Sequence, residues 1–181
     1  DRDVDKAKSM LEEAGVSGLK MKLGYISSDA VQSAQALLIQ EQLKEVGVTV
    51  ELAGGDGTAI ANAMKDPDNE YDMYLGGYIM GIDPDTFSSL FENDGAYNYM
   101  HYSGYDTINQ LFEEGRSELD ESARKETYAK LQAAVQDTGA FYPIISNNKI
   151  LVVNNRIQSV EDAGLVPVYT FEDTSSLKIA E

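Results

Sequence analysis

Tyrosines gather in one stretch of the sequence, next to its only histidine. Four tyrosines and His101 lie in NDGAYNYMHYSGY at 93–105, and Tyr78 lies in the glycine-rich segment YDMYLGGYIMGIDPD at 71–85. Tyrosine joins a large apolar ring to a hydroxyl group, which makes it a common lining of binding clefts. Alternatively, some of these rings only fill the core or a contact between domains. The pattern favours ligand contact over catalysis.

Motifs for catalysis and for nucleotide binding are absent from the sequence. There is no cysteine, which excludes a thiolate metal site and a cysteine nucleophile, and a single histidine excludes metal centres built on a histidine pair. No GxSxG motif is present, and GGDG at 54–57 matches neither GxGxxG nor GxxxxGK[ST]. A glycosidase needs two carboxylates a few ångströms apart, and the sequence alone does not place any two of the 31 acidic residues at such a distance. We therefore predict no catalytic residue and no cofactor.

An acidic run, DPDNEYD at 66–72, has some likeness to a calcium-binding loop. Such a loop needs oxygen ligands at fixed offsets, a glycine at its sixth position and a glutamate at its twelfth. Tyr71 occupies the sixth position here and Gly77 the twelfth. The run is therefore predicted to be a solvated turn without a metal.

Net charge and length limit the classes of function. The chain has 14 Lys and Arg against 31 Asp and Glu, a net charge of −17, and so repels the phosphates of nucleic acid. Its 181 residues suit one domain, and no apolar run is long enough to span a membrane. The start, DRDVDKAKSM, is no signal peptide, and we expect the chain to be a fragment of a longer protein.

Hydrophobic periodicity predicts alternating helices and strands in the first half of the chain. The strands are expected to be parallel and to form one sheet, with both connecting helices on the same face. The predicted elements are helices at 3–14, 29–46 and 58–65 and strands at 19–26, 48–52 and 71–75. The loop after the third strand would then open at the carboxyl end of the sheet, where α/β proteins hold ligands.

The second half is predicted to be mainly helical. Expected are a short helix from Pro84 to about Phe91, helices at 106–119 and from Asp120 to about Gly139, and strands at 141–145 and 149–153. Leu119 belongs to the expected apolar face of the helix at 106–119. The last stretch, 154–181, is weakly patterned, and its apolar residues are expected to need a partner surface.

The order of these segments resembles the extracellular solute-binding proteins, family 5, which deliver oligopeptides and dipeptides to ABC importers. The likeness runs from Val4 to about Val153 and rests on DKAKSMLEEAGV, ALLIQEQLKEVGVTVEL, YDMYLGGYIMGIDPDTFSSLF and the segment from YNYMH to AFYPI. It implies an α/β fold, one lobe of a type II periplasmic-binding-protein-like fold, with a mixed, mostly parallel sheet flanked by helices. Residues 1–181 would form a single C-terminal lobe, with 154–181 packing on a lobe that is missing here.

The resemblance implies a noncatalytic substrate-binding component that holds an oligopeptide between two lobes and delivers it to a membrane permease. It also implies an exported monomer, in the periplasm or on the extracellular face of the membrane through a lipid-anchored cysteine upstream of Asp1. Two alternatives stay open: the same fold with a sugar, metal chelate or other non-peptide solute, and a stand-alone doubly wound enzyme or signalling domain.

By position, the resemblance places the loop 77–84 and the region of Tyr97 at the ligand. The residues expected to contact it are Gly77, Tyr78, Ile79, Met80, Asp83, Tyr97, Asn98 and Tyr102. Family members often have Trp where Tyr78 stands, and peptide binders place an amine-binding Asp three residues later, where this chain has Gly81. Asp83 could substitute, although capping of the following helix is its simpler role.

Overall fold

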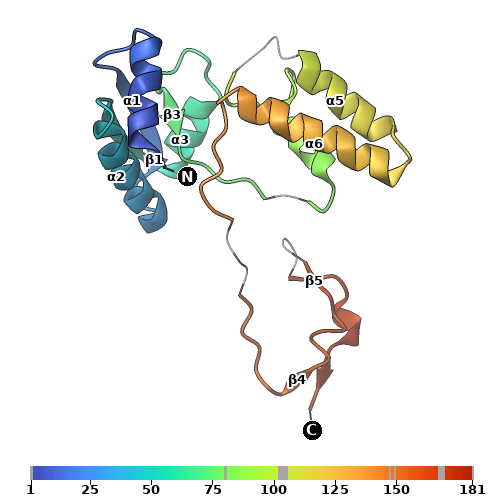
Figure 1. Cartoon of the computed structure of the whole chain (residues 1–181). Helices are drawn as coiled ribbons and strands as arrows, with labels where there is room; N and C mark the ends of the chain where they lie inside the picture. Colours follow the sequence, from blue (N-terminus) through green and yellow to red (C-terminus); the bar gives the residue numbers. More distant parts are fainter. Residues whose placement is uncertain are drawn as a thin grey trace. The chain divides into compact units, whose positions relative to one another are not determined.

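The computed structural model describes residues 2–79, 81–101, 106–146, 148, 150–166 and 170–180. The chain divides into two compact units, Asp1–Gly77 and Tyr78–Glu181 (Figure 1). The first unit is an α/β layer structure, and the second consists of helices followed by short antiparallel strand pairs.

The first unit is built on a parallel sheet with the strand order β2-β1-β3. Its strands are β1 (Lys20–Ile26), β2 (Thr49–Gly55) and β3 (Met73–Tyr74). The predicted parallel α/β arrangement is confirmed, but the third strand has two residues instead of five. Its pairing with β1 is correspondingly short, from Leu23–Met73 to Gly24–Tyr74.

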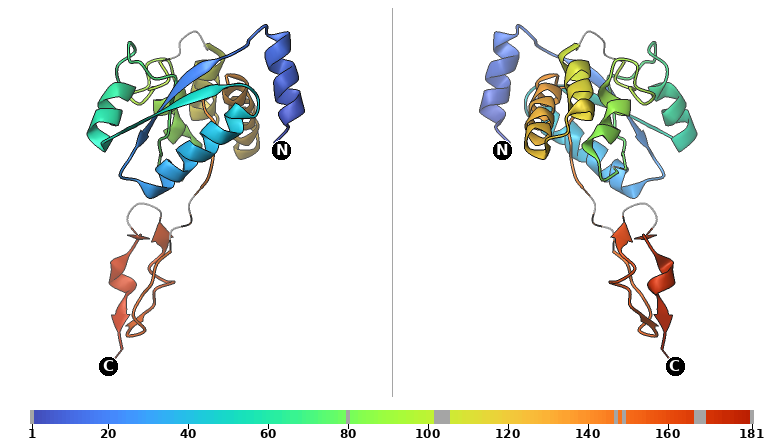
Figure 2. Two further views of the ribbon diagram at one scale, coloured as in Figure 1. Left: turned by 90° about the vertical axis from the view of Figure 1, so that its left-hand side faces the viewer. Right: turned by 90° about the vertical axis from the view of Figure 1, so that its right-hand side faces the viewer.

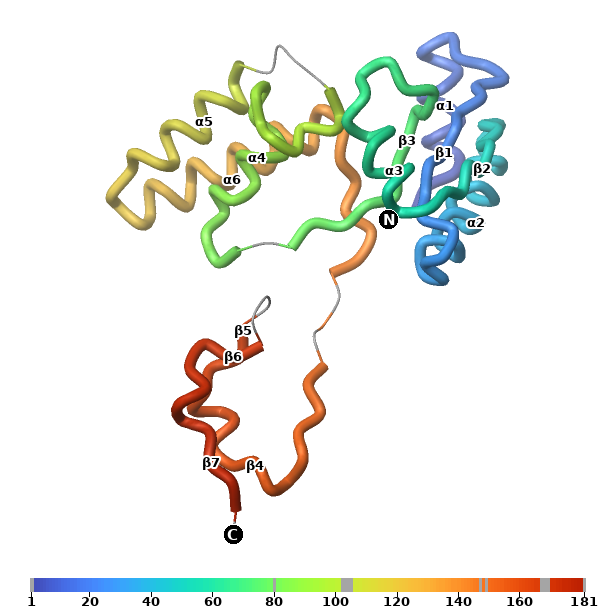
Figure 3. The backbone as a smooth tube through the Cα atoms, turned by 180° about the vertical axis from the view of Figure 1, so that it is seen from behind, coloured from blue at the N-terminus to red at the C-terminus, as the bar shows by residue number. Residues whose placement is uncertain are grey.

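The two connecting helices cover opposite faces of this sheet. They are α2 (Ala30–Lys44) and α3 (Gly57–Met64), and α1 (Val4–Glu13) lies on the side of α2 (Figures 1 and 3). The side chain of Ile60 on α3 lies beside Gly55, whereas Val50, on the other face of β2, clusters with Ala36 of α2. The prediction that both helices share one face is wrong. Because β2 and β3 add to opposite sides of β1, two right-handed crossovers must return over opposite faces.

The core of the first unit forms between the sheet and α2, which packs along the strands (Figure 2). Its buried residues are Leu23, Ala36, Val48, Val50 and Leu75. Asp29 caps α2 by accepting the backbone N–H groups of Val31 and Gln32, and Gly47, two residues before β2, adopts a positive φ of 86°. This left-handed residue lets the chain turn from the helix into the strand.

In the residues that the structure describes, four helices make the body of the second unit. They are η1 (Pro84–Phe87), α4 (Ser88–Phe91), α5 (Asp106–Ser117) and α6 (Glu121–Asp137). The helices α5 and α6 lie side by side (Figures 1 and 3) and enclose a core of Leu90, Phe91, Ile108, Leu111, Phe112 and Leu131. Asp120 caps α6 through the N–H of Ala123, as expected.

Leu119 was predicted to belong to the apolar face of α5, and this prediction is wrong. The helix ends at Ser117, and Leu119 is 96% exposed in the turn before α6. Leu119 would lie on the apolar face of α5 only if that helix continued to residue 119. Instead, Asp120 is already the N-cap of α6.

The strands predicted at 141–145 and 149–153 do not form among the described residues 141–146, 148 and 150–153. The segment is rich in apolar residues, but several are exposed, including Tyr142 at 85%. A strand exists only when its backbone bonds to a second strand, and Pro143 also lacks a donor. The sequence pattern alone could not supply the partner.

The final residues form small antiparallel pairs that the sequence did not predict. β4 (Ile157–Gln158) pairs with β7 (Lys178–Ile179), and β5 (Leu165–Val166) pairs with β6 (Thr170–Phe171) (Figure 3). A single 3₁₀ turn, η2 (Thr174–Ser176), precedes β7. Ala163 is completely buried within this part of the chain. Pairs of two residues leave too little periodicity for a sequence pattern to reveal.

Replacing Phe112 with alanine should destabilise the protein strongly. Phe112 on α5 is fully buried in a core shared with α4 and α6, so Phe112→Ala should lower the free energy of unfolding by about 3–5 kcal/mol. Leu119→Ala is the matched control and should change it by less than about 0.5 kcal/mol, because that side chain is exposed. Urea unfolding followed by circular dichroism measures both. Equal costs for the two variants would contradict the core assignment.

Candidate functional site

Tyr78 is anchored by its hydroxyl group to the segment that follows it. The hydroxyl donates to the carbonyl oxygen of Thr86 at 2.9 Å and lies 2.8 Å from Ser89 Oγ. Thr86 belongs to η1, which begins at Asp83–Pro84, and Ser89 belongs to α4, which follows it. The hydroxyl is therefore engaged in hydrogen bonds within the chain, and the ring is the part of Tyr78 that a ligand would contact.

Among the described residues, six aromatic rings form a continuous series of contacts, which we call the aromatic row. In order of contact they are Phe141, Phe91, Phe87, Tyr78, Tyr97 and Tyr99. Successive ring centroids are 5.3, 5.8, 5.9, 6.4 and 5.9 Å apart, within the range in which aromatic pairs attract each other. Phe91 is buried, whereas Tyr97 is 48% exposed. The row thus connects the core of the second unit to its surface.

The turn before Tyr97 is held by close backbone contacts. The N–H of Tyr97 donates to the carbonyl oxygen of Ser89 at 2.8 Å. Gly95 lies so close to the same carbonyl that a Cβ atom there would be 2.5 Å from its oxygen. Asn98 donates its side-chain amide to the carbonyl oxygens of Glu92, at 3.2 Å, and Asn93, at 3.4 Å. Asn98 thus has a structural role in this turn, and Gly95 is a residue that the sequence analysis missed.

Asp83 is the N-cap of η1 and forms an ion pair with Arg124. Its Oδ1 accepts the N–H of Asp85 at 2.8 Å, and Nη2 of Arg124 lies 2.8 and 3.0 Å from its two carboxylate oxygens. The hydrogen bond from Arg124, and then that from Asp85, lowers the pKa of Asp83. The capping role expected from the sequence is confirmed, and the arginine partner on α6 was not foreseen.

Arg116 on α5 joins two further carboxylates of the same segment. Its Nε donates to Asp85 Oδ1 at 2.9 Å, and its Nη2 bonds to Glu92 Oε1. The hydrogen bond to Glu92 is the main cause of a raised pKa of Arg116. Burial raises the pKa of Tyr128, whose hydroxyl lies 3.4 Å from Asp85 Oδ1. We call Arg116, Arg124, Tyr128 and their carboxylate partners Asp83, Asp85 and Glu92 the arginine network.

The structure brings together four of the eight predicted ligand residues, Tyr78, Asp83, Tyr97 and Asn98, in the second unit. Ile79 is exposed in the loop after Tyr78, and Gly77 is exposed at the end of the first unit. Met80 and Tyr102 lie outside the described residues.

The GGDG stretch and the acidic run at 66–72, which have some likeness to a phosphate-binding and a calcium-binding loop, both have local structural roles. Asp56 of the GGDG stretch accepts the N–H groups of Thr58 and Ala59, so its own carboxylate occupies the amino end of α3. In the acidic run, Asp66 Oδ1 accepts the N–H of Asp68, which makes a tight turn. Among the described residues, no three His, Cys, Asp or Glu side chains are grouped so that they could hold a metal ion, and none of the helices has the length and hydrophobicity of a membrane span.

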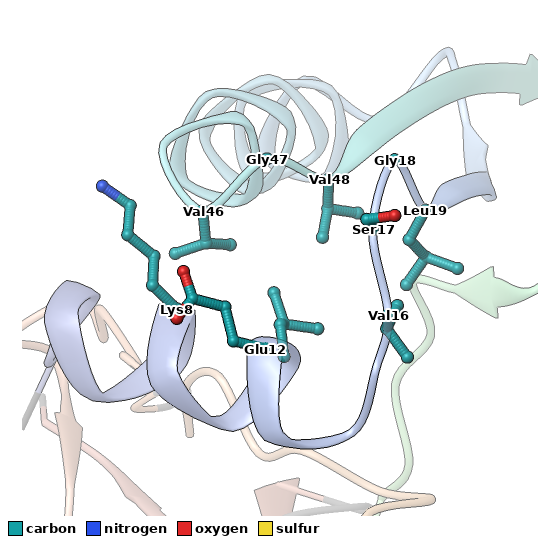
Figure 4. A pocket seen from close by; sticks show the side chains of 10 residues that line it. Lys8, Glu12, Val16, Ser17, Gly18, Leu19, Val46, Gly47 and Val48 are labelled. Atoms are coloured by element: carbon teal, nitrogen blue, oxygen red, sulfur yellow. The ribbon is translucent and has the colours of Figure 1, made fainter.

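The first unit also has a shallow hollow of about 200 Å³ between the end of α1, the start of β1 and the end of α2 (Figure 4). Valine and leucine side chains surround it, with Lys8 and Glu12 at one side. It contains none of the predicted ligand residues.

The fold is that of substrate-binding proteins of ABC transporters. It matches the ABC transporter substrate-binding protein CtaP from Listeria monocytogenes with a TM-score of 0.90 and 37% identity, over all of this chain and 37% of that chain. It also matches AppA from Clostridium difficile, which is described as a candidate peptide-binding protein, with a TM-score of 0.86 and 30% identity, over 99% of this chain and 37% of the other. These matches confirm the predicted type II lobe.

Residues 1–99 match the family model described as "Bacterial extracellular solute-binding proteins, family 5 Middle", and the chain belongs to this family. A curated relative, the nickel-binding periplasmic protein of Escherichia coli, is 22% identical over 97% of this chain. The chain spans 36% of that relative's length. The predicted family is thereby confirmed.

Replacing Gly95 with alanine should loosen the turn that carries Tyr97. The new methyl group would collide with the Ser89 carbonyl, so Gly95→Ala should lower the free energy of unfolding by about 1–3 kcal/mol. Gly77→Ala is the control, since a Cβ there meets no atom within 4 Å. Chemical denaturation of both variants tests the contact, and a Gly95→Ala protein as stable as Gly77→Ala would disprove it.

The ion pair between Asp83 and Arg124 makes a contribution to stability that depends on pH. Because the pKa of Asp83 is lower in the folded than in the unfolded protein, this contribution is complete above the unfolded pKa and is lost as the pH falls through the folded one. Arg124→Gln should raise the pKa of Asp83 towards its ordinary value, and NMR titration of the carboxyl carbon measures this. Lys125→Gln removes the same charge one residue away and should leave the pKa unchanged. The same pKa in Arg124→Gln and the unaltered protein would contradict the pair.

Proposed function

We propose that this chain is part of the substrate-binding component of an ABC importer and that its aromatic row forms part of a site for oligopeptides. The observation that carries the proposal is Tyr97, the most exposed ring of a series of aromatic contacts that reaches the core. Membership of the solute-binding family supports it, as does the likeness to AppA of Clostridium difficile.

The chemistry of the row suits a ligand of variable sequence. Aromatic faces give large contact areas to apolar groups and peptide planes without demanding one particular side chain. The hydroxyl of Tyr78 and the amide of Asn98 already bond to the chain itself. The row therefore contributes ring contact, and groups elsewhere in the whole protein fix the peptide backbone.

The proposed mechanism is closure of a clamp. Residues 1–181 serve as one lobe, and a peptide bridges it to a second lobe, with 154–181 packing against the remainder of the protein. The ligand shifts an open–closed equilibrium because it contacts both lobes only in the closed form. The permease recognises the closed protein, which works as an exported, lipid-anchored monomer without catalysis.

A non-peptide solute is the second candidate. The match to a nickel-binding relative over nearly the whole chain favours it. Mass spectrometry of small molecules that co-purify with the full-length protein distinguishes the two. A ladder of short peptides supports the peptide proposal, and a single non-peptide solute or metal chelate overturns it while leaving the fold assignment intact.

Tyr97→Ala in the full-length protein should weaken peptide binding by about tenfold, since it removes the exposed ring. Tyr142→Ala is the control, because Tyr142 is an exposed tyrosine of the same unit with no ring contact to the row among the described residues. Calorimetric titration with a pool of tri- to pentapeptides measures both affinities. If Tyr97→Ala binds as tightly as the unaltered protein, the row is not part of the site.

A further inference from the structure

We propose that Arg124 positions the aromatic row by holding Asp83, and that Asp83 is consequently a positioning residue rather than the receptor for a ligand's ammonium group. This inference rests on the proposed peptide-binding function. It assigns roles to two residues 41 positions apart in the sequence.

Arg124 makes three separate contacts that fix its guanidinium group. Its Nη2 bonds to both carboxylate oxygens of Asp83, and its Nε donates to the carbonyl oxygen of Gly115 at 2.8 Å. The group also lies over the ring of Tyr128, 4.9 Å from the centroid. One planar cation thus joins α5, α6 and the start of η1, a geometry that the ammonium group of lysine cannot reproduce.

Arg116 holds the same segment at a second point and at its far end. It bonds to Asp85, near the start of η1, and to Glu92, directly after α4. The two arginines therefore fix residues 83–92 at both ends to the helices α5 and α6. All three carboxylates of this segment have an arginine partner.

The segment so fixed supports the rings of the aromatic row. Phe87 and Phe91 belong to both the segment and the row. Thr86 and Ser89 hold the hydroxyl of Tyr78, and the Ser89 carbonyl accepts the N–H of Tyr97. A shift of the segment would therefore move Tyr78 and Tyr97 together, and a displacement of this kind weakens a preorganised site.

The arginine also changes what Asp83 can recognise. Both of its oxygens face one guanidinium nitrogen, and Oδ1 additionally caps η1. A ligand's ammonium group would have to displace an intramolecular partner that is held by two other contacts. We therefore expect binding to be insensitive to whether the amino end of a peptide is free or blocked.

The experiment uses the full-length protein and two probes, an equimolar pool of pentapeptides and the same pool with acetylated amino ends. Arg124→Gln and Asp83→Asn should each weaken binding of both pools, because each removes the ion pair that holds the segment. The effect should be a modest three- to tenfold, about the size expected of a partly exposed pair. The double variant should bind no worse than either single one, since both remove the same interaction. Arg124→Lys should recover part of the affinity, and the control Lys125→Gln should bind normally.

Hydrogen–deuterium exchange without ligand gives a readout that does not depend on the identity of the ligand. Arg124→Gln and Asp83→Asn should each speed exchange of peptides from 83–97 by about threefold, with exchange of β1 and β2 nearly unchanged. Lys125→Gln should have no such effect.

Two results would overturn the proposal. In one, Asp83→Asn weakens only the pool with free amino ends, which would make Asp83 the ammonium receptor. In the other, exchange over 83–97 is the same in Arg124→Gln and the unaltered protein. If neither pool binds the unaltered protein, the peptide function fails, and the exchange result still decides whether Arg124 positions the row.

Discussion

The ion pairs between two helices and one short acidic segment are the constraint on which the second unit depends. Asp83, Asp85 and Glu92 lie within ten residues in a chain whose net charge is already −17. Uncompensated, these charges would repel one another beside an apolar core. Arg116 and Arg124, placed on adjacent helices, let the segment pack its phenylalanines against α5 and α6 while its carboxylates stay paired.

The aromatic row follows from this arrangement. Phe91 places the row in the core of the second unit, and Tyr97 is its most exposed ring. The hydroxyl of Tyr78 holds its ring in place by hydrogen bonds within the chain. In the proposed site, such a row would bind by contact area and preorganisation.

In the first unit, the strand order decides which face of the sheet each connecting helix covers. With β1 in the centre, the strand order reverses, and the helices α2 and α3 are distributed over the two faces of the sheet. Carboxyl ends of strands at such a reversal are common ligand positions in α/β proteins. Here Asp29 and Asp56 cap the helices that begin there, which gives these helix ends a partner within the chain.

The sequence by itself determined the elements whose stabilising contacts are local. Periodicity and caps within a few residues predicted α1, α2, α5 and α6, the turn at Gly47 and the parallel order of β1 and β2, and the ordered set of segments predicted the family. Contacts between distant residues were decided only by the tertiary structure. The pair of Arg124 with Asp83, the faces taken by α2 and α3, and the unpaired state of the described residues at 141–153 all depend on which segments meet in space. Local patterns record how a side chain suits a helix or a strand, but carry no information on which distant backbone or charge will pair with it.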